Sequence, residues 1–184
     1  WASSPELQHQ DLPNVGLQGD GYYRPMQIQG DWIPYTGCVM AIDPSGKGKD
    51  ETAYCVTKFL NGNIYLAEIG GFNAGYSEHT LTYLIKQYPC TTEMIRKQTN
   101  KHRRILDTLE PLISQHRIIV DKQVIKDDYE GTNALYPNET AIRYQLFYQI
   151  SRLQKEVHSL SHDDRIDCLQ IACHYWVQHL VKDQ

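Results

Sequence analysis

The sequence predicts an α/β protein with a mixed sheet that starts as three antiparallel strands and is flanked by helices. The first observation is the pair of segments 52–60 and 63–70, rich in Tyr, Val, Thr and Ile, with the hairpin dipeptide Asn61-Gly62 between them. The second is the change to helical spacing of apolar residues after this hairpin. The third is size: 184 residues, 41% hydrophobic and without an internal repeat, suit one domain with its own core.

The first part of the chain is expected to hold an arm and then the sheet. Residues 1–36 show little periodicity and contain four prolines, so we expect a linker or extended arm on the surface of a domain that spans 37–184. An apolar run over 37–43 predicts the first strand. A tight loop over 44–50 leads into the hairpin, which completes a meander of three strands.

The rest of the chain is expected to alternate helices with short strands. Apolar spacing predicts helices over 77–86, 101–115, 122–130, 140–156 and 163–182, with a kink or an early end at Pro111. Short strands are expected at 91–96 and 117–120. The buried face of the last helix is predicted to consist of Ile166, Leu169, Cys173, Trp176 and Leu180.

Composition excludes several classes of protein. A net charge of −4 argues against a protein that coats nucleic acid by bulk charge, although it leaves room for a local basic patch. No apolar run approaches the roughly 20 residues that cross a membrane, so no membrane partner is expected. The cysteines form no C-x-x-C pair, and four of them have apolar neighbours. We expect these four to be reduced core residues: Cys38, Cys55, Cys168 and Cys173.

Two acidic segments point to metal chemistry. Asp43 ends the first predicted strand, where it either starts a turn with Pro44 or serves a site. Asp163 and Asp164 begin the last helix, where capping needs one carboxylate and leaves the second for other work. Because Mg²⁺ prefers carboxylate oxygens, these segments would form a metal site if the fold brings them together. His162 is either a ligand, a proton carrier or a loop histidine.

Two groups of basic residues are candidates for DNA contacts. The loop after Asp43 carries Lys47 and Lys49, but Asp50 stands where a nucleotide-binding loop requires Ser or Thr, so phosphate contacts explain it better than ATP binding. Residues 96–104 hold five further basic residues, which form either a solvated helix start or a phosphate-binding track. They are Arg96, Lys97, Lys101, Arg103 and Arg104.

Residues 41–52, Ala-Ile-Asp-Pro-Ser-Gly-Lys-Gly-Lys-Asp-Glu-Thr, resemble the first nuclease motif of the large terminase subunit of short-tailed, double-stranded-DNA phages. Further stretches follow in the family's order at 68–72, 107–111, 146–149 and 162–169. The resemblance implies a ribonuclease H-like fold and an endonuclease that uses two Mg²⁺ or Mn²⁺ ions to cut concatemeric viral DNA during packaging. In this interpretation Asp43 and Asp164 are the principal metal ligands. Asp163 is an alternate or outer ligand, and Asp50 is a weaker candidate.

The resemblance also implies partners. They are double-stranded DNA, an ATPase domain that precedes the nuclease in the same polypeptide, the portal and the small terminase subunit. The expected location is the host cell cytoplasm, transiently on the procapsid. The chain would then be an isolated C-terminal nuclease domain.

One departure from the family concerns the passage from Lys86 to Cys90. The family has a strand with a further acidic ligand here, followed by a Gly-rich loop, and this sequence has neither. We therefore expect a segment to be missing or unobserved near 86–90, and the third acidic ligand has no counterpart. Three alternatives stay open: a resolvase or integrase, an exonuclease on the same scaffold, and a DNA-binding or assembly module without catalytic activity.

Overall fold

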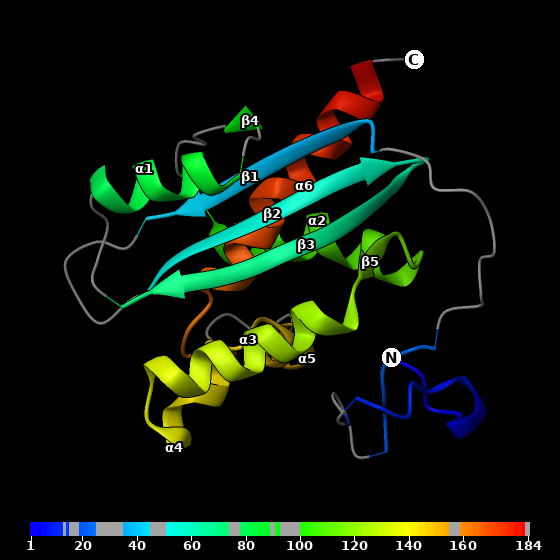
Figure 1. Ribbon diagram of the computed structural model, residues 1–184. Coiled ribbons are helices and arrows are strands. Elements are labelled where there is room, and N and C mark those ends of the chain that lie inside the picture. The colour runs from blue at the N-terminus through cyan, green and yellow to red at the C-terminus, as the bar shows by residue number, and fades with distance from the viewer. Residues whose placement is uncertain are drawn as a thin grey trace.

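The structure is a computed structural model of the 184-residue chain. It describes residues 1–12, 14, 19–24, 35–44, 51–73, 78–88, 91–92, 100–154 and 159–182. A mixed five-stranded sheet lies at the centre, and helices cover both of its faces (Figure 1).

Three antiparallel strands form the middle of the sheet, as the sequence predicts. They are β1 (Gly37–Asp43), β2 (Thr52–Leu60) and β3 (Asn63–Phe72). The pairing of β1 with β2 runs from Gly37 opposite Phe59 to Asp43 opposite Ala53. Asn61 and Gly62 join β2 to β3 with positive φ angles of 50° and 79°. This is the backbone that a two-residue hairpin turn requires.

Two short strands extend the sheet on either side. Thr91–Thr92 (β4) pairs in parallel with β1, and Ile118–Val120 (β5) pairs in parallel with β3. The strand order is β4-β1-β2-β3-β5. Both strands agree with the sequence prediction, although residues 93–96 of the first one lie outside the described residues.

Long helices begin and end close to the predicted positions. They are α1 (Glu78–Gln87), α2 (Lys101–Ser114), α3 (Lys122–Leu135) and α6 (Asp164–Lys182). Pro111 neither ends α2 nor prevents the next three residues from being helical. Helix α3 extends five residues beyond the prediction, and the buried residue in this added part is the polar Thr132, which an apolar pattern does not reveal.

The predicted single helix over 140–156 is wrong in its continuity, and its residues 155–156 lie outside the described residues. The chain forms three short elements there, α4 (Asn138–Ala141), a 3₁₀ turn η2 (Ile142–Tyr144) and α5 (Leu146–Arg152). Gln145 has an extended backbone with ψ of 128° and separates the last two. The break lets the buried Tyr144 ring stack between Tyr136, with ring centroids 3.8 Å apart, and His162, at 3.9 Å.

Alternate residues of β1 divide the core into two layers. Val39 and Ala41 face the larger cluster, which includes residues of α2, α3, α5 and α6. Met40 faces the smaller cluster with Leu84 of α1. On the larger side, Trp176 of α6 donates its indole N–H to Thr57 of β2 at 3.0 Å. Helix α6 is therefore fixed directly on the sheet that carries Asp43.

The cysteines divide into two kinds. Cys55, Cys168 and Cys173 are buried free thiols in the larger cluster, as predicted. Cys38 is disulfide-bonded, so the prediction that it is a reduced core thiol is wrong. Local sequence does not indicate such a bond, because the pairing depends on which segments the fold places side by side.

The N-terminal segment contacts the domain through aromatic side chains. Ala2 bridges to Gly21 and Gln8 to Tyr23, so residues 1–12 and 19–24 hold each other. The Tyr22 ring packs edge-on against Phe147 at 5.7 Å, and Tyr23 packs against His116 at 4.8 Å. Within the described residues, no helix combines the length and the apolar character needed to cross a membrane.

Candidate active site

Two regions of the chain bring three carboxylates to the end of β1. Asp43 is the last residue of this strand, and its side chain is only 13% exposed. Asp163 directly precedes α6, and Asp167 lies in the first turn of that helix. The apolar face of α6 lies across β1 and β2, so the start of the helix meets the end of β1. The structure thus brings Asp43 to the N-terminus of the last helix, as expected.

Lys101 lies at the centre of these carboxylates. Its Nζ is 3.7 Å from Asp43 Oδ2, 2.9 Å from Asp163 Oδ1 and 3.1 Å from Asp167 Oδ2. Lys101 is the first residue of α2, after Asn100, which accepts a hydrogen bond from the Arg103 backbone N–H. We call Asp43, Asp163, Asp167 and Lys101 the aspartate–lysine cluster.

Helix α2 is held in place for this contact by its packing on α6. Gln170 of α6 donates a hydrogen bond to the Thr108 hydroxyl at 3.0 Å, and Ile105 and Leu109 are buried in the larger cluster. Arg104 adds a guanidinium that pairs with Asp167. Asp167 therefore lies between two cations, Lys101 and Arg104.

The electrostatics of Lys101 follow from its surroundings. Partial burial favours the neutral amine, but the carboxylates of Asp167, Asp163 and Asp43 outweigh this effect. The pKa of Lys101 is consequently raised above its ordinary value, and the side chain is a permanent cation at neutral pH.

The structure gives the predicted ligands different positions. Asp43 and Asp163 belong to the cluster, whereas Asp164 is the half-buried first residue of α6. Asp167 was missed, although its spacing of four residues from Asp163 places both on one helical face. Asp50 lies outside the described residues. The His162 ring stacks on Tyr144.

The predicted basic residues differ in their surroundings. Lys101 and Arg104 face the carboxylates, on the side where a DNA phosphate was expected. Arg103 is well exposed and pairs with Asp107 at 3.4 Å, one helical turn away. Lys47, Lys49, Arg96 and Lys97 lie outside the described residues. Contact of any of these side chains with phosphate stays a prediction.

The cluster offers the oxygen ligands of a metal site but holds a lysine among them. Three carboxylates from two regions of the chain are the donor set that Mg²⁺ uses. Among the side chains that the structure describes, however, no group of three or more His, Cys, Asp or Glu residues is arranged to hold a metal ion. The carboxylate oxygens are suitable ligands for a divalent cation, but their arrangement around Lys101 is not that of a metal site.

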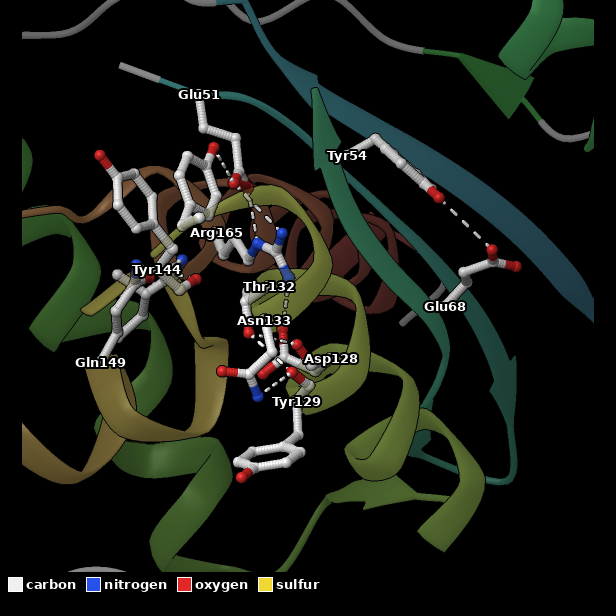
Figure 2. A network of polar contacts seen from close by, with 12 residues as sticks. Glu51, Tyr54, Glu68, Asp128, Tyr129, Thr132, Asn133, Tyr144, Gln149 and Arg165 are labelled. Atoms are coloured by element: carbon white, nitrogen blue, oxygen red, sulfur yellow. Dashed lines mark hydrogen bonds and ion pairs between the residues drawn. The ribbon is translucent and has the colours of Figure 1, made fainter. Parts of the chain in front are cut away.

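A second, fully buried ion-pair network fixes the first turn of α6 (Figure 2). Arg165 donates from Nε to Glu51 Oε1 at 2.6 Å and from Nη2 to Glu51 Oε2 at 3.1 Å, and from Nη1 to Asp128 Oδ1 at 2.6 Å. Tyr136 donates its hydroxyl to Glu51 at 2.8 Å. The Arg165 side chain is 2% exposed. This network joins the start of β2, α3 and α6, and it places residues 163–167 relative to the sheet.

Burial also raises the pKa of one carboxyl group in this network, that of Asp128. Removal from water raises the pKa of Asp128 from 3.8 to about 6, although the neighbouring Arg165 favours the charged form. Sequence reasoning missed Glu51, Asp128 and Arg165, because charged residues are expected at the surface unless a partner is known.

A cavity of about 480 Å³ lies elsewhere, between the N-terminal segment and the domain. Tyr22 and Tyr23 line it on one side, and Ile118, Ile125 and Phe147 line it on the other. Its described lining includes no carboxylate of the aspartate–lysine cluster, so the cavity is separate from the predicted site.

Comparison with known proteins finds a family model and a relative that are similar to this chain. Residues 42–90 match the family model described as terminase of bacteriophage T7, ribonuclease H-like domain. The terminase large subunit of Enterobacteria phage T3 is 34% identical over an alignment of 206 positions, which covers 95% of this chain and 35% of that protein. The chain thus spans about a third of the length of this relative.

Solved structures show a weaker likeness. The large terminase from the thermophilic bacteriophage D6E aligns with 82% of this chain and 42% of its own, at 10% identity and a TM-score of 0.45. The same protein in complex with ATP-gamma-S aligns with 78% of this chain and 41% of its own, at 8% identity and a TM-score of 0.45. These low scores do not by themselves establish a common fold.

The mixed sheet with its antiparallel three-stranded start, together with the family match at 42–90, confirms the predicted ribonuclease H-like fold. The relative from phage T3 extends the similarity to nearly the whole chain. The chain is therefore similar to phage terminase large subunits over nearly its whole length, and residues 42–90 match the ribonuclease H-like domain of that family.

Proposed function

We propose that this domain is the nuclease of a terminase large subunit, a metal-dependent endonuclease that cuts concatemeric viral double-stranded DNA during genome packaging. The observation that carries the proposal is the convergence of Asp43, Asp163 and Asp167 at the end of β1. The similarity to terminase large subunits supports the choice of DNA as substrate.

The residues of the site have distinct roles in this proposal. Asp43 is a metal ligand from the sheet, and Asp164 with Asp163 supplies ligands from the start of α6. Asp167, on the same helical face as Asp163, is an added candidate. A bound Mg²⁺ or Mn²⁺ pair would supply an activated water and stabilise the leaving oxygen. Arg104 lies beside the carboxylates and is suited to hold a DNA phosphate.

The proposed partners follow from the family rather than from contacts. They are double-stranded DNA, an ATPase domain of the same polypeptide, the portal and the small terminase subunit. The relative from phage T3 is almost three times as long as its matched part, which leaves room for an additional domain. The proposed site of action is the host cell cytoplasm.

Nicking of a covalently closed plasmid tests this function. Replacing Asp43 with Asn removes a carboxylate from the end of β1 and changes the side-chain volume little, so we expect loss of nicking in Mn²⁺ and an unchanged circular dichroism spectrum. Asp107→Asn is the matched control, because Asp107 is exposed on α2 and contacts Arg103 instead of the cluster. Full nicking activity of the Asp43 variant would show that the assignment of Asp43 as a metal ligand of the nuclease is wrong.

A DNA-binding or assembly module without catalytic activity is the second candidate, and the lysine within the carboxylates is the observation that favours it. Titration with Mn²⁺ separates the two, since a competent site binds metal and cuts, and an inactive one does neither. Comparing branched DNA with closed plasmid DNA distinguishes a resolvase from a terminase nuclease.

A further inference from the structure

We propose that Lys101 is a resident counter-ion that competes with a divalent cation for Asp43, Asp163 and Asp167. Metal enters the cluster only when the Lys101 side chain leaves it. This inference rests on the proposed function, and it assigns to Lys101 a role in controlling metal occupancy instead of a contact with DNA.

The first argument is position. One nitrogen lies within 3.7 Å of an oxygen from each of three carboxylates, which is where a cation shared by these groups must lie. Asp43 and Asp167 are 13% and 6% exposed, so water screens their mutual repulsion poorly. An ammonium and a divalent cation therefore satisfy the same electrostatic demand and exclude each other.

The second argument is that Lys101 can leave. Its side chain is 37% exposed, and the lysine stem is long and flexible. It is the first residue of α2, where the helix dipole disfavours a cation, so the attraction of the carboxylates has to overcome that effect. Arg165 differs in each respect, because it is 2% exposed and held by a bidentate pair with Glu51 and by Asp128.

The third argument separates competition from an ordinary ion pair. Removal of a purely structural lysine would destabilise the domain equally with and without metal. Removal of a competing lysine leaves three facing carboxylates, and a divalent cation then replaces it. The variant lacking Lys101 should therefore lose stability in EDTA and regain it in Mn²⁺.

The experiment measures Mn²⁺ binding by calorimetry and the melting temperature with EDTA or Mn²⁺, on the 184-residue chain without DNA. For Lys101→Met we expect Mn²⁺ to bind about tenfold more tightly than in wild type, because a partly buried ion pair no longer has to be broken. Lys101→Arg keeps the charge and should bind like wild type. Lys122→Met removes an exposed lysine from the first position of α3 and controls for net charge.

Each outcome decides the question. Tighter binding and Mn²⁺-dependent recovery of stability in Lys101→Met alone support competition. Equal or weaker binding in that variant overturns it, while plasmid nicking by the wild type would still support the nuclease. If neither wild type nor variant binds Mn²⁺, both the competition and the metal-dependent nuclease are wrong.

Discussion

Asp128 shows how a single buried residue connects the position of the site to pH. It accepts a hydrogen bond from Arg165, which in turn holds Glu51, and all three are nearly inaccessible to water. Arg165 donates hydrogen bonds to two carboxylates at once. The pKa of Asp128 is nevertheless raised, because the effect of its removal from water exceeds the opposite effect of Arg165. The folded state consequently binds a proton at Asp128 more tightly than the unfolded chain does.

The stability contributed by this group should therefore depend on pH. With a pKa raised from 3.8 to about 6, the contribution is fully present below about pH 4 and is lost as the pH rises through 6. We expect urea unfolding at pH 4, 5, 6 and 7 to show a larger decrease in the free energy of unfolding for wild type than for Asp128→Asn, which cannot titrate. Parallel curves for the two proteins would show that Asp128 is ionised throughout.

At the scale of elements, the contact between Glu51 and Arg165 positions the start of α6. This contact needs a residue without a side chain at position 71 of β3. A Cβ atom at Gly71 would overlap the Glu51 carboxylate, and Glu51 cannot move aside without breaking its bonds to Arg165 and Tyr136. Gly71 is required because a side chain from another element fills the space beside it. Its backbone φ angle is not positive.

Gly71→Ala should therefore destabilise the domain by about 1–3 kcal/mol, the typical cost of adding a methyl group to a packed site. Gly131→Ala is the matched control, since no described atom outside its own helix backbone and chain neighbours lies within 4 Å of a Cβ there. Gly131 lies inside α3, where alanine is favoured over glycine by about 0.5–1 kcal/mol. Thermal unfolding should show a lower melting temperature for the first variant and an unchanged or higher one for the second.

Local signals predicted most of the elements and only part of the site. Asn61-Gly62 determines a hairpin by its own backbone preference, and the apolar stripe of α6 depends on residues within one helix. Arg165 and Glu51 are 114 positions apart, so their pairing follows from the packed fold and not from either sequence context. The break at Gln145 was missed for the same reason, because it serves the stacking of Tyr144 on rings from two other segments.

At the scale of the whole molecule, basic side chains gather at the carboxylates of a protein with a net charge of −4. Arg104 and Lys101 contact the carboxylates, and Arg103 lies exposed beside them on α2. An acidic protein needs such a region to approach a duplex. The predicted contacts of Arg103 and Arg104 are with phosphates, which give affinity without sequence information.

Neutralising Arg103 and Arg104 together, as glutamines, should weaken DNA binding about equally for unrelated sequences. The dependence of log affinity on log salt concentration should become flatter by about 0.9 for each phosphate that the variant no longer neutralises. Fluorescence anisotropy in EDTA at several salt concentrations measures both effects without cleavage. A weakening confined to one sequence, or an unchanged slope, would point to a docking surface for a protein partner.

The buried thiols next to the carboxylates can be used to measure how often α6 separates from the sheet. Cys168 follows Asp167 and donates its S–H to the Ala41 carbonyl at 3.1 Å, and Cys55 donates to the Cys168 carbonyl at 3.4 Å. Burial raises the pKa of Cys168 and of Cys173 well above the ordinary value, which keeps them unreactive while the fold is closed. A thiol-specific reagent reaches Cys168 only after α6 has separated from β1 and β2. The rate of alkylation there measures how often the two halves of the carboxylate set come apart.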